Sequence, residues 1–172
     1  MEDKPEKPGY ALLRRFRESQ PGRGYFLTTN LASRGRGLEE GALTDSIRQE
    51  WQKMEADGSW LVRTAVVMPD HVHLLVMLNE RRSLEECMRL FKGRLSRDLR
   101  QRNLGWQGGF HEHRMRGAED IAPIFHYVYL NPYRAKLVLE NQTWPGYYCS
   151  AEDWKWFGIM TAESVPQPEW LK

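Results

Sequence analysis

The stretch WLVRTAVVMPDHVHLLVML, residues 60–78, decides the fold. It holds two runs rich in apolar and β-branched residues, 60–67 and 72–78, and such runs predict β-strands. Met68, Pro69 and Asp70 stand between them, and these residue types favour a tight turn. Two strands joined by so short a turn pair antiparallel, so the stretch predicts a β-hairpin.

The flanking sequence predicts further elements on both sides of this hairpin. Residues 24–31 (GYFLTTNL) predict a strand, and residues 44–56 predict a helix with Thr44 as its N-cap. Ser83, with Glu86 three residues later, predicts a capping box at the start of the longest helix. Residues 110–115 predict a fourth strand.

A last helix is expected to begin near Glu119 and Asp120 and to run to about Asn131. Pro123 fits only in its first turn, where the missing N–H costs nothing, and Pro132 disfavours continuation. The resulting order, βαββαβα, is compatible with an α+β fold: a ferredoxin-like antiparallel sheet with helices on one face.

The length and composition are those of one domain, 1–172. We expect a core of about residues 10–140 and an aromatic, acidic C-terminal extension, 141–172, that covers it. The N-terminus is charged, and no apolar run approaches the length of a membrane span. The two cysteines have no metal-type spacing. We therefore expect a cytoplasmic protein without a membrane partner.

Positive charge is concentrated although the net charge is only +2. Residues 10–36 are rich in arginine, and residues 81–103 hold eight basic residues against three acidic ones. Guanidinium groups pair with phosphate in a bidentate way, so both stretches suit a nucleic-acid backbone. The alternative is an ordinary solvated helix face.

His71 and His73 form the sharpest local signal. Side chains alternate along a strand, so both imidazoles point to one face, with their Cα atoms roughly 6.7 Å apart. The opposite face is apolar and anchors the strand in the core. Such a pair can hold one metal ion if a third protein group or a phosphate oxygen completes the site. The alternative is two half-exposed strand histidines that bind nothing.

Tyr127 and Asn131 form a second candidate pair on the last helix. They are four residues apart and share a helix face, whereas Tyr129 lies about 200° away around the axis. This places a phenol for attack beside an amide that can ligate the same metal, which would help a phenol of pKa near 10 to lose its proton. The alternative is that both tyrosines are packing residues.

His111 and His113 also alternate onto one strand face and could form a rival metal site. Their strand is short, polar and flanked by glycine, so we expect these ligands to be held loosely. His113 or Glu112 could instead contact DNA or support the main site.

Three blocks taken together resemble one family. They are MPDHVHLLV (68–76), WQGGFHEHRMR (106–116) and YVYLNPYRAKLV (127–138). In this order they resemble the single-tyrosine HUH transposases, and within these the REP-associated tyrosine transposases of bacteria. The resemblance spans roughly residues 24–138.

The resemblance implies a role for each matching residue. His71 and His73 correspond to the HUH ligands of a divalent metal, Mg²⁺ or Mn²⁺, and Tyr127 to the nucleophile. Asn131 stands where related insertion-sequence enzymes carry a glutamine that serves as third ligand. The fold implied is that of the HUH endonucleases.

The implied reaction is cleavage and rejoining of single-stranded DNA through a 5′-phosphotyrosine. The implied partner is a DNA strand with a REP-type hairpin, bound by a monomer or a homodimer. Basic and polar side chains would hold the DNA. The candidates are Arg14, Arg15, Arg17, Arg94, Arg97 and His113.

Two other functions remain compatible with the residues. A non-catalytic nucleic-acid-binding protein on the same scaffold would bind without metal and would not cleave. A hydrolytic metal nuclease would cleave with water and would survive loss of Tyr127.

Overall fold

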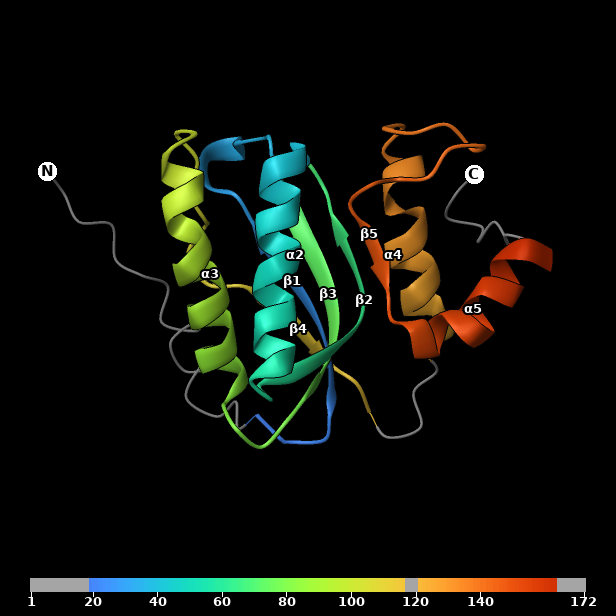
Figure 1. Ribbon diagram of the computed structural model, residues 1–172, viewed down its shortest axis with the longest axis horizontal. Coiled ribbons are helices and arrows are strands. Elements are labelled where there is room, and N and C mark those ends of the chain that lie inside the picture. The colour runs from blue at the N-terminus through green and yellow to red at the C-terminus, as the bar shows by residue number, and fades with distance from the viewer. Residues whose placement is uncertain (1–18, 117–120, 164–172) are drawn as a thin grey trace, which may run out of the picture.

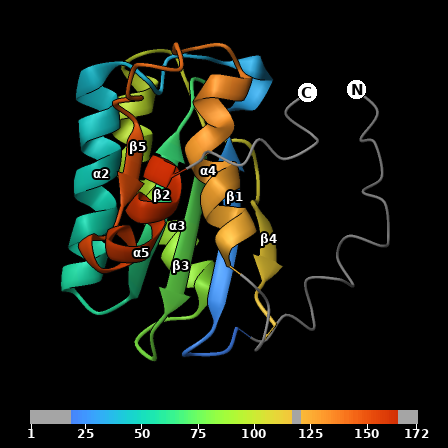
Figure 2. The same cartoon turned by 90° about the vertical axis from the view of Figure 1, so that its right-hand side faces the viewer.

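An antiparallel sheet organises the chain in the computed structural model, which describes residues 19–116 and 121–163. Its five strands are β1 (Gly24–Asn30), β2 (Trp60–Val67), β3 (His71–Leu78), β4 (His111–Arg114) and β5 (Tyr147–Cys149). They lie in the order β4-β1-β3-β2-β5, so the predicted hairpin β2–β3 is at the centre (Figure 2). The predicted α+β fold with an antiparallel sheet is confirmed.

Helices lie on both faces of this sheet (Figure 1). They are α2 (Gly41–Ala56), α3 (Leu84–Arg100), α4 (Ala122–Arg134) and α5 (Ala151–Glu163), with a short 3₁₀ turn η1 (Ala32–Arg34) after β1. The predicted placement on one face holds for α2 and α3. It does not hold for the last predicted helix, α4, which packs on the opposite face.

The α2–α3 face carries the larger core. Leu74 and Val76 of β3 are fully buried there against Trp51 of α2 and Phe91 of α3. Burying a large apolar side chain contributes about 1.5–3 kcal/mol, so this cluster anchors the central strand.

The other face of β3 is also apolar beyond the histidines, and this is why α4 can pack there. Leu75 of β3 and Phe125 of α4 belong to one buried cluster, and Val66 of β2 and Val128 of α4 belong to a second. A strand that buries residues on both faces needs cover on both.

The ends of the helices correct two predictions. The Ser83–Glu86 capping box of α3 is present, but α2 begins at Gly41, and the Thr44 hydroxyl donates to the Leu38 carbonyl oxygen without capping the helix. Pro123 lies in the first turn of α4 as expected, whereas the helix continues through Pro132 to Arg134. The predicted start at 119–120 lies outside the described residues.

The C-terminal extension contributes to the sheet as well as covering it. β5 pairs antiparallel with β2, and α5 packs beside α4 through the buried ring of Phe157, which contacts Phe125. Arg63 of β2 donates to the Asp153 carboxylate of α5 at 3.1 Å. Among the described residues, no helix has the length and apolar character needed to cross a membrane.

Candidate active site

His71 and His73 project from the start of β3 toward α4. Their ring centroids are 4.6 Å apart, so the alternation of the strand brings both imidazoles to one place. His73 is only 5% exposed, and Phe26 of β1 stacks on its ring at 5.3 Å. The two histidines are therefore held on β3, the central strand of the sheet, whose other face is buried in the larger core.

Each histidine is oriented by an oxygen at its Nδ1 atom. The Asp70 carboxylate accepts a hydrogen bond from Nδ1 of His71 at 2.7 Å, and Thr28 Oγ1 lies 2.8 Å from Nδ1 of His73. Thr28 occupies this position because it pairs directly with His73 across the β1–β3 ladder. Both contacts leave Nε2 as the nitrogen available to a ligand.

Burial keeps His73 neutral. Loss of solvation, followed by the neighbouring His71, lowers the pKa of His73 to about 3. A neutral imidazole is the form that binds metal ions.

Tyr127 of α4 closes the site from the other side. Its hydroxyl lies 3.5 Å from Nε2 of His73, and its ring meets the Phe26 ring edge-on, with centroids 5.9 Å apart. Folding thus brings Tyr127, 54 residues after His73, to Nε2 of His73, the ring nitrogen that does not contact Thr28. This arrangement juxtaposes a potential nucleophile and a potential metal ligand.

Tyr129 occupies a different environment, as the helical spacing predicted. Its ring packs on Tyr147 of β5 and Phe157 of α5, with centroids 5.1 and 5.8 Å away. It therefore packs against the C-terminal extension and does not share the face of Tyr127.

Asn131 lies one turn beyond Tyr127 on α4 and is half-buried. Within the described residues, no hydrogen bond joins its side chain to either histidine. It is near the site by position on the helix, while its predicted role as a ligand remains a prediction.

The donor set fits a divalent metal in part. His71 and His73 would hold the ion through their Nε2 atoms, since each Nδ1 is already engaged. In the part of the chain that the structure describes, no group of three or more His, Cys, Asp or Glu side chains comes together. Completion would therefore require Asn131 or an oxygen of the substrate.

The predicted DNA contacts are spread over the molecule. Arg14, Arg15 and Arg17 lie outside the described residues. Arg94 and Arg97 are exposed on α3. This helix lies across the sheet from α4, which carries Tyr127 (Figure 1).

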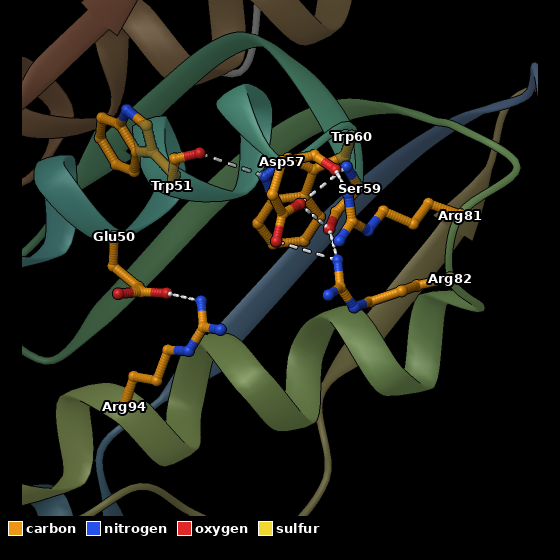
Figure 3. A network of polar contacts seen from close by, with 8 residues as sticks. All are labelled: Glu50, Trp51, Asp57, Ser59, Trp60, Arg81, Arg82 and Arg94. Atoms are coloured by element: carbon orange, nitrogen blue, oxygen red, sulfur yellow. Dashed lines mark hydrogen bonds and ion pairs between the residues drawn. The ribbon is translucent and has the colours of Figure 1, made fainter.

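Several basic side chains near α3 take part in internal contacts (Figure 3). Arg94 pairs with the buried Glu50 of α2 at 2.8 Å. Arg82 donates to the Asp57 carboxylate at 2.9 Å, and Arg81 donates to the Asp57 carbonyl oxygen. These contacts join α2 and the turn after it to α3 and the loop before it, so part of this basic stretch is structural.

His111 and His113 lie on the same face of the sheet as His73. In the β1–β4 register they pair with Thr28 and Phe26, whose side chains contact His73. Both histidines are exposed on a four-residue edge strand. They are placed to meet a ligand that approaches the site along the sheet.

Four residues around the site were not singled out from the sequence: Phe26, Thr28, Asp70 and Arg134, whose guanidinium lies over the Tyr127 ring. Asp70 directly precedes the histidine motif, so its position was a usable signal. Phe26 and Thr28 depend on the register of two strands 45 residues apart, which the local pattern does not reveal. Arg134 depends on a helix that continues through proline.

Comparison with known proteins places the chain in a family. Residues 31–129 match the family described as "Transposase IS200 like". The REP-associated tyrosine transposase of Escherichia coli strain K12 is 28% identical over 125 residues, which cover 70% of this chain and 73% of that protein. A solved REP-associated tyrosine transposase bound to a REP hairpin has a TM-score of 0.64 and 26% identity, covering 76% of this chain and 79% of that one.

These matches confirm the resemblance drawn from the three sequence blocks. The family match extends over more than half of the chain and includes His71, His73 and Tyr127. The chain therefore belongs to the IS200-like transposases, a family of enzymes that cleave and join DNA.

Proposed function

We propose that this protein is a metal-dependent, single-tyrosine transposase that cleaves and rejoins single-stranded DNA. The observation that carries the proposal is the 3.5 Å approach of the Tyr127 hydroxyl to Nε2 of His73, beside His71. A nucleophile from one element and a ligand pair from another meet at this point.

The proposed step is a transesterification at phosphorus. The Tyr127 oxygen bonds to the phosphorus, and the bond from phosphorus to the 3′ oxygen breaks. The phenol gives up its proton to solvent, and the departing oxygen takes one to become a 3′-hydroxyl. The product is a 5′-phosphotyrosine, and attack by a 3′-hydroxyl reverses the step and joins strands. The reaction needs no external energy source, because one phosphate ester replaces another.

His71 and His73 would hold Mg²⁺ or Mn²⁺, and a bound divalent ion would polarise the phosphate oxygens. The chain's own contribution is rigidity. Asp70 and Thr28 fix the two rings, and the core beneath β3 fixes the strand. Such support keeps ligands within the narrow geometry that catalysis requires.

We further propose that the substrate strand carries a REP-type hairpin. The support is the similarity to a REP-associated transposase whose solved structure holds such a hairpin. Exposed basic residues of α3, with His113 on β4, are proposed to hold the DNA. Monomer and homodimer are both compatible with this substrate.

The test is incubation of the protein with an end-labelled, hairpin-bearing single strand and Mn²⁺, followed by denaturing electrophoresis. We expect a covalent adduct that disappears with chelator and with Tyr127→Phe. Tyr129→Phe is the matched control, because its ring packs on β5 and α5 on another side of the helix. It is expected to form adduct at close to the wild-type rate.

Each alternative function predicts a different result in gel electrophoresis. A binding protein without catalysis would shift the hairpin in a native gel but would leave every strand intact. A hydrolytic nuclease would release free fragments and would remain active with Tyr127→Phe. Either result would overturn the proposal.

A further inference from the structure

The helix α4 carries one more charged residue toward the site. Arg134 is seven residues after Tyr127, so two turns bring it to nearly the same face, about 10 Å further along the axis. This placement exists because α4 continues through Pro132. A helix ending at Asn131 would have released Arg134 into a loop.

The direction of the side chain closes that distance. Side chains on a helix lean toward its N-terminus, so Arg134 extends back along α4. Its guanidinium carbon lies 5.6 Å from the centre of the Tyr127 ring, while its side chain stays exposed. The cation is thus held against the ring of the proposed nucleophile at the surface of the protein.

The proposed reaction has a need for this charge. A phosphodiester is anionic before attack, and the transition state concentrates negative charge on its oxygens. His71 and His73 are neutral as ligands, so positive charge on their side of the phosphate would come from the divalent ion that they would hold. Arg134 would add a second positive charge from α4. A guanidinium beside the nucleophile can donate two parallel hydrogen bonds to phosphate oxygens.

We propose that Arg134 is a catalytic residue that binds the non-bridging oxygens of the phosphate that Tyr127 attacks. This inference rests on the proposed function. Arg134 takes no proton and forms no covalent bond. It neutralises charge on the phosphate and leaves the bond changes to Tyr127 and the 3′ oxygen. The competing explanation is purely structural, with the guanidinium only holding the Tyr127 ring in place.

A neutral phosphate separates these two roles. The cleaved bond is first mapped with wild-type protein, and the strand is then made with one methylphosphonate at that bond. Replacing the charged oxygen by methyl removes the need for a cation at the phosphate but leaves the need for an oriented tyrosine. The measured quantity is the rate of adduct formation on each strand.

We expect Arg134→Ala to slow adduct formation on the phosphodiester at least 100-fold, the usual loss for one transition-state donor. On the methylphosphonate we expect it to lie within about tenfold of wild type, because the charge is gone. On the phosphodiester, the rate of adduct formation for Arg134→Lys should lie between the rates of wild type and Arg134→Ala. Lysine keeps the positive charge but cannot donate the two parallel hydrogen bonds of a guanidinium.

Lys53→Ala is the control. It removes an exposed cation from α2, a helix with no proposed part in DNA binding or cleavage, and is expected to leave both rates unchanged. Thermal melting of each variant checks that the fold is retained.

Equal losses for Arg134→Ala on both strands, or no loss on either, would overturn the role at the phosphate. The proposed function would still stand, because wild-type protein would still form its adduct. A wild-type protein that forms no adduct would instead overturn the proposed function and this inference with it.

Discussion

Asp70 illustrates how one half-buried residue can orient a histidine of the candidate site. Its side chain is 47% exposed, yet its carboxylate fixes the orientation and the tautomer of His71. Carboxylates placed behind a histidine ligand usually contribute 10- to 100-fold to metal affinity. The free energy of unfolding should depend little on such an exposed side chain.

We therefore expect Asp70→Asn to weaken Mn²⁺ binding about 10- to 100-fold and to leave the melting temperature nearly unchanged. Isothermal titration with Mn²⁺ measures the affinity, and excess Mn²⁺ should restore adduct formation. Asp45→Asn, an exposed carboxylate on α2, is the control. Unchanged Mn²⁺ affinity in Asp70→Asn would show that this carboxylate does not support a metal ligand.

At the level of residues, the sequence was informative where chemistry lies in a short motif. His71 and His73 share a strand face, and Tyr127 and Tyr129 face different surroundings, as their spacing predicts. The environment of His73 could not be predicted in this way. Its contacts with Thr28 and Tyr127 bridge 45 and 54 residues, and only the folded chain defines such distances.

Among the elements, α5 is attached to the sheet in part by the buried carboxylate of Asp153, which pairs with Arg63 of β2. Asp153 is 4% exposed and accepts hydrogen bonds from Arg63, from Ser150 and from the Trp156 indole. Burial by itself raises the pKa of this carboxyl, but these donors outweigh burial and hold the pKa below its usual 3.8. The ionised form therefore stabilises the docked helix.

We expect Asp153→Asn to lower the free energy of unfolding by about 2 kcal/mol at pH 7. Because the folded-state pKa is lowered, the stabilisation is complete above the unfolded value and is lost as pH falls through the folded value. The difference between wild type and variant should thus be constant above pH 5 and shrink below about pH 4. Urea unfolding at several pH values measures it.

Glu152→Gln is the control for this prediction. That side chain is 83% exposed and pairs with Lys155 on the surface, so its loss should change stability by less than about 0.5 kcal/mol. A difference between wild type and Asp153→Asn that persisted unchanged at pH 3 would contradict the role of the ionised carboxylate.

The predicted elements were accurate where apolar periodicity is strong, as in β2, β3 and α3. The helix end at Pro132 was wrong because flanking packing of Val128 and Leu130 outweighs the lost hydrogen bond. β5 was missed because three residues give too short an alternation, and its pairing with β2 depends on partners 81 to 85 residues earlier. The predicted face for α4 was wrong, because the residues on a strand face do not indicate which helix will pack against it.

For the whole molecule, the sheet separates two groups of cations. Helices α3 and α4 lie on opposite sides of the sheet (Figure 1). Arg97 belongs to α3, and Arg134 lies beside Tyr127 on α4. If DNA contacts the α3 side, that contact contributes to affinity and not to the chemical step. Binding and cleavage should then respond differently to the same change.

We expect Arg97→Ala to weaken hairpin binding and to reduce the slope of log affinity against log salt by about one. Its rate of adduct formation at saturating DNA should match wild type. Arg94→Ala is the comparison, because its guanidinium pairs with buried Glu50 and its loss should reduce stability more than the salt slope. Titration with DNA at three salt concentrations measures the affinity and its salt slope. An unchanged slope for Arg97→Ala would show that the DNA does not contact Arg97.

The central position of β3 affects the order in which parts of the protein unfold. β3 is hydrogen-bonded along both edges, to β1 and to β2, so exposing its backbone requires the sheet itself to come apart. α5 is held through far fewer contacts and can open locally while the sheet persists. Partial unfolding therefore removes the periphery first, and His71 and His73 stay in register until the whole domain is lost.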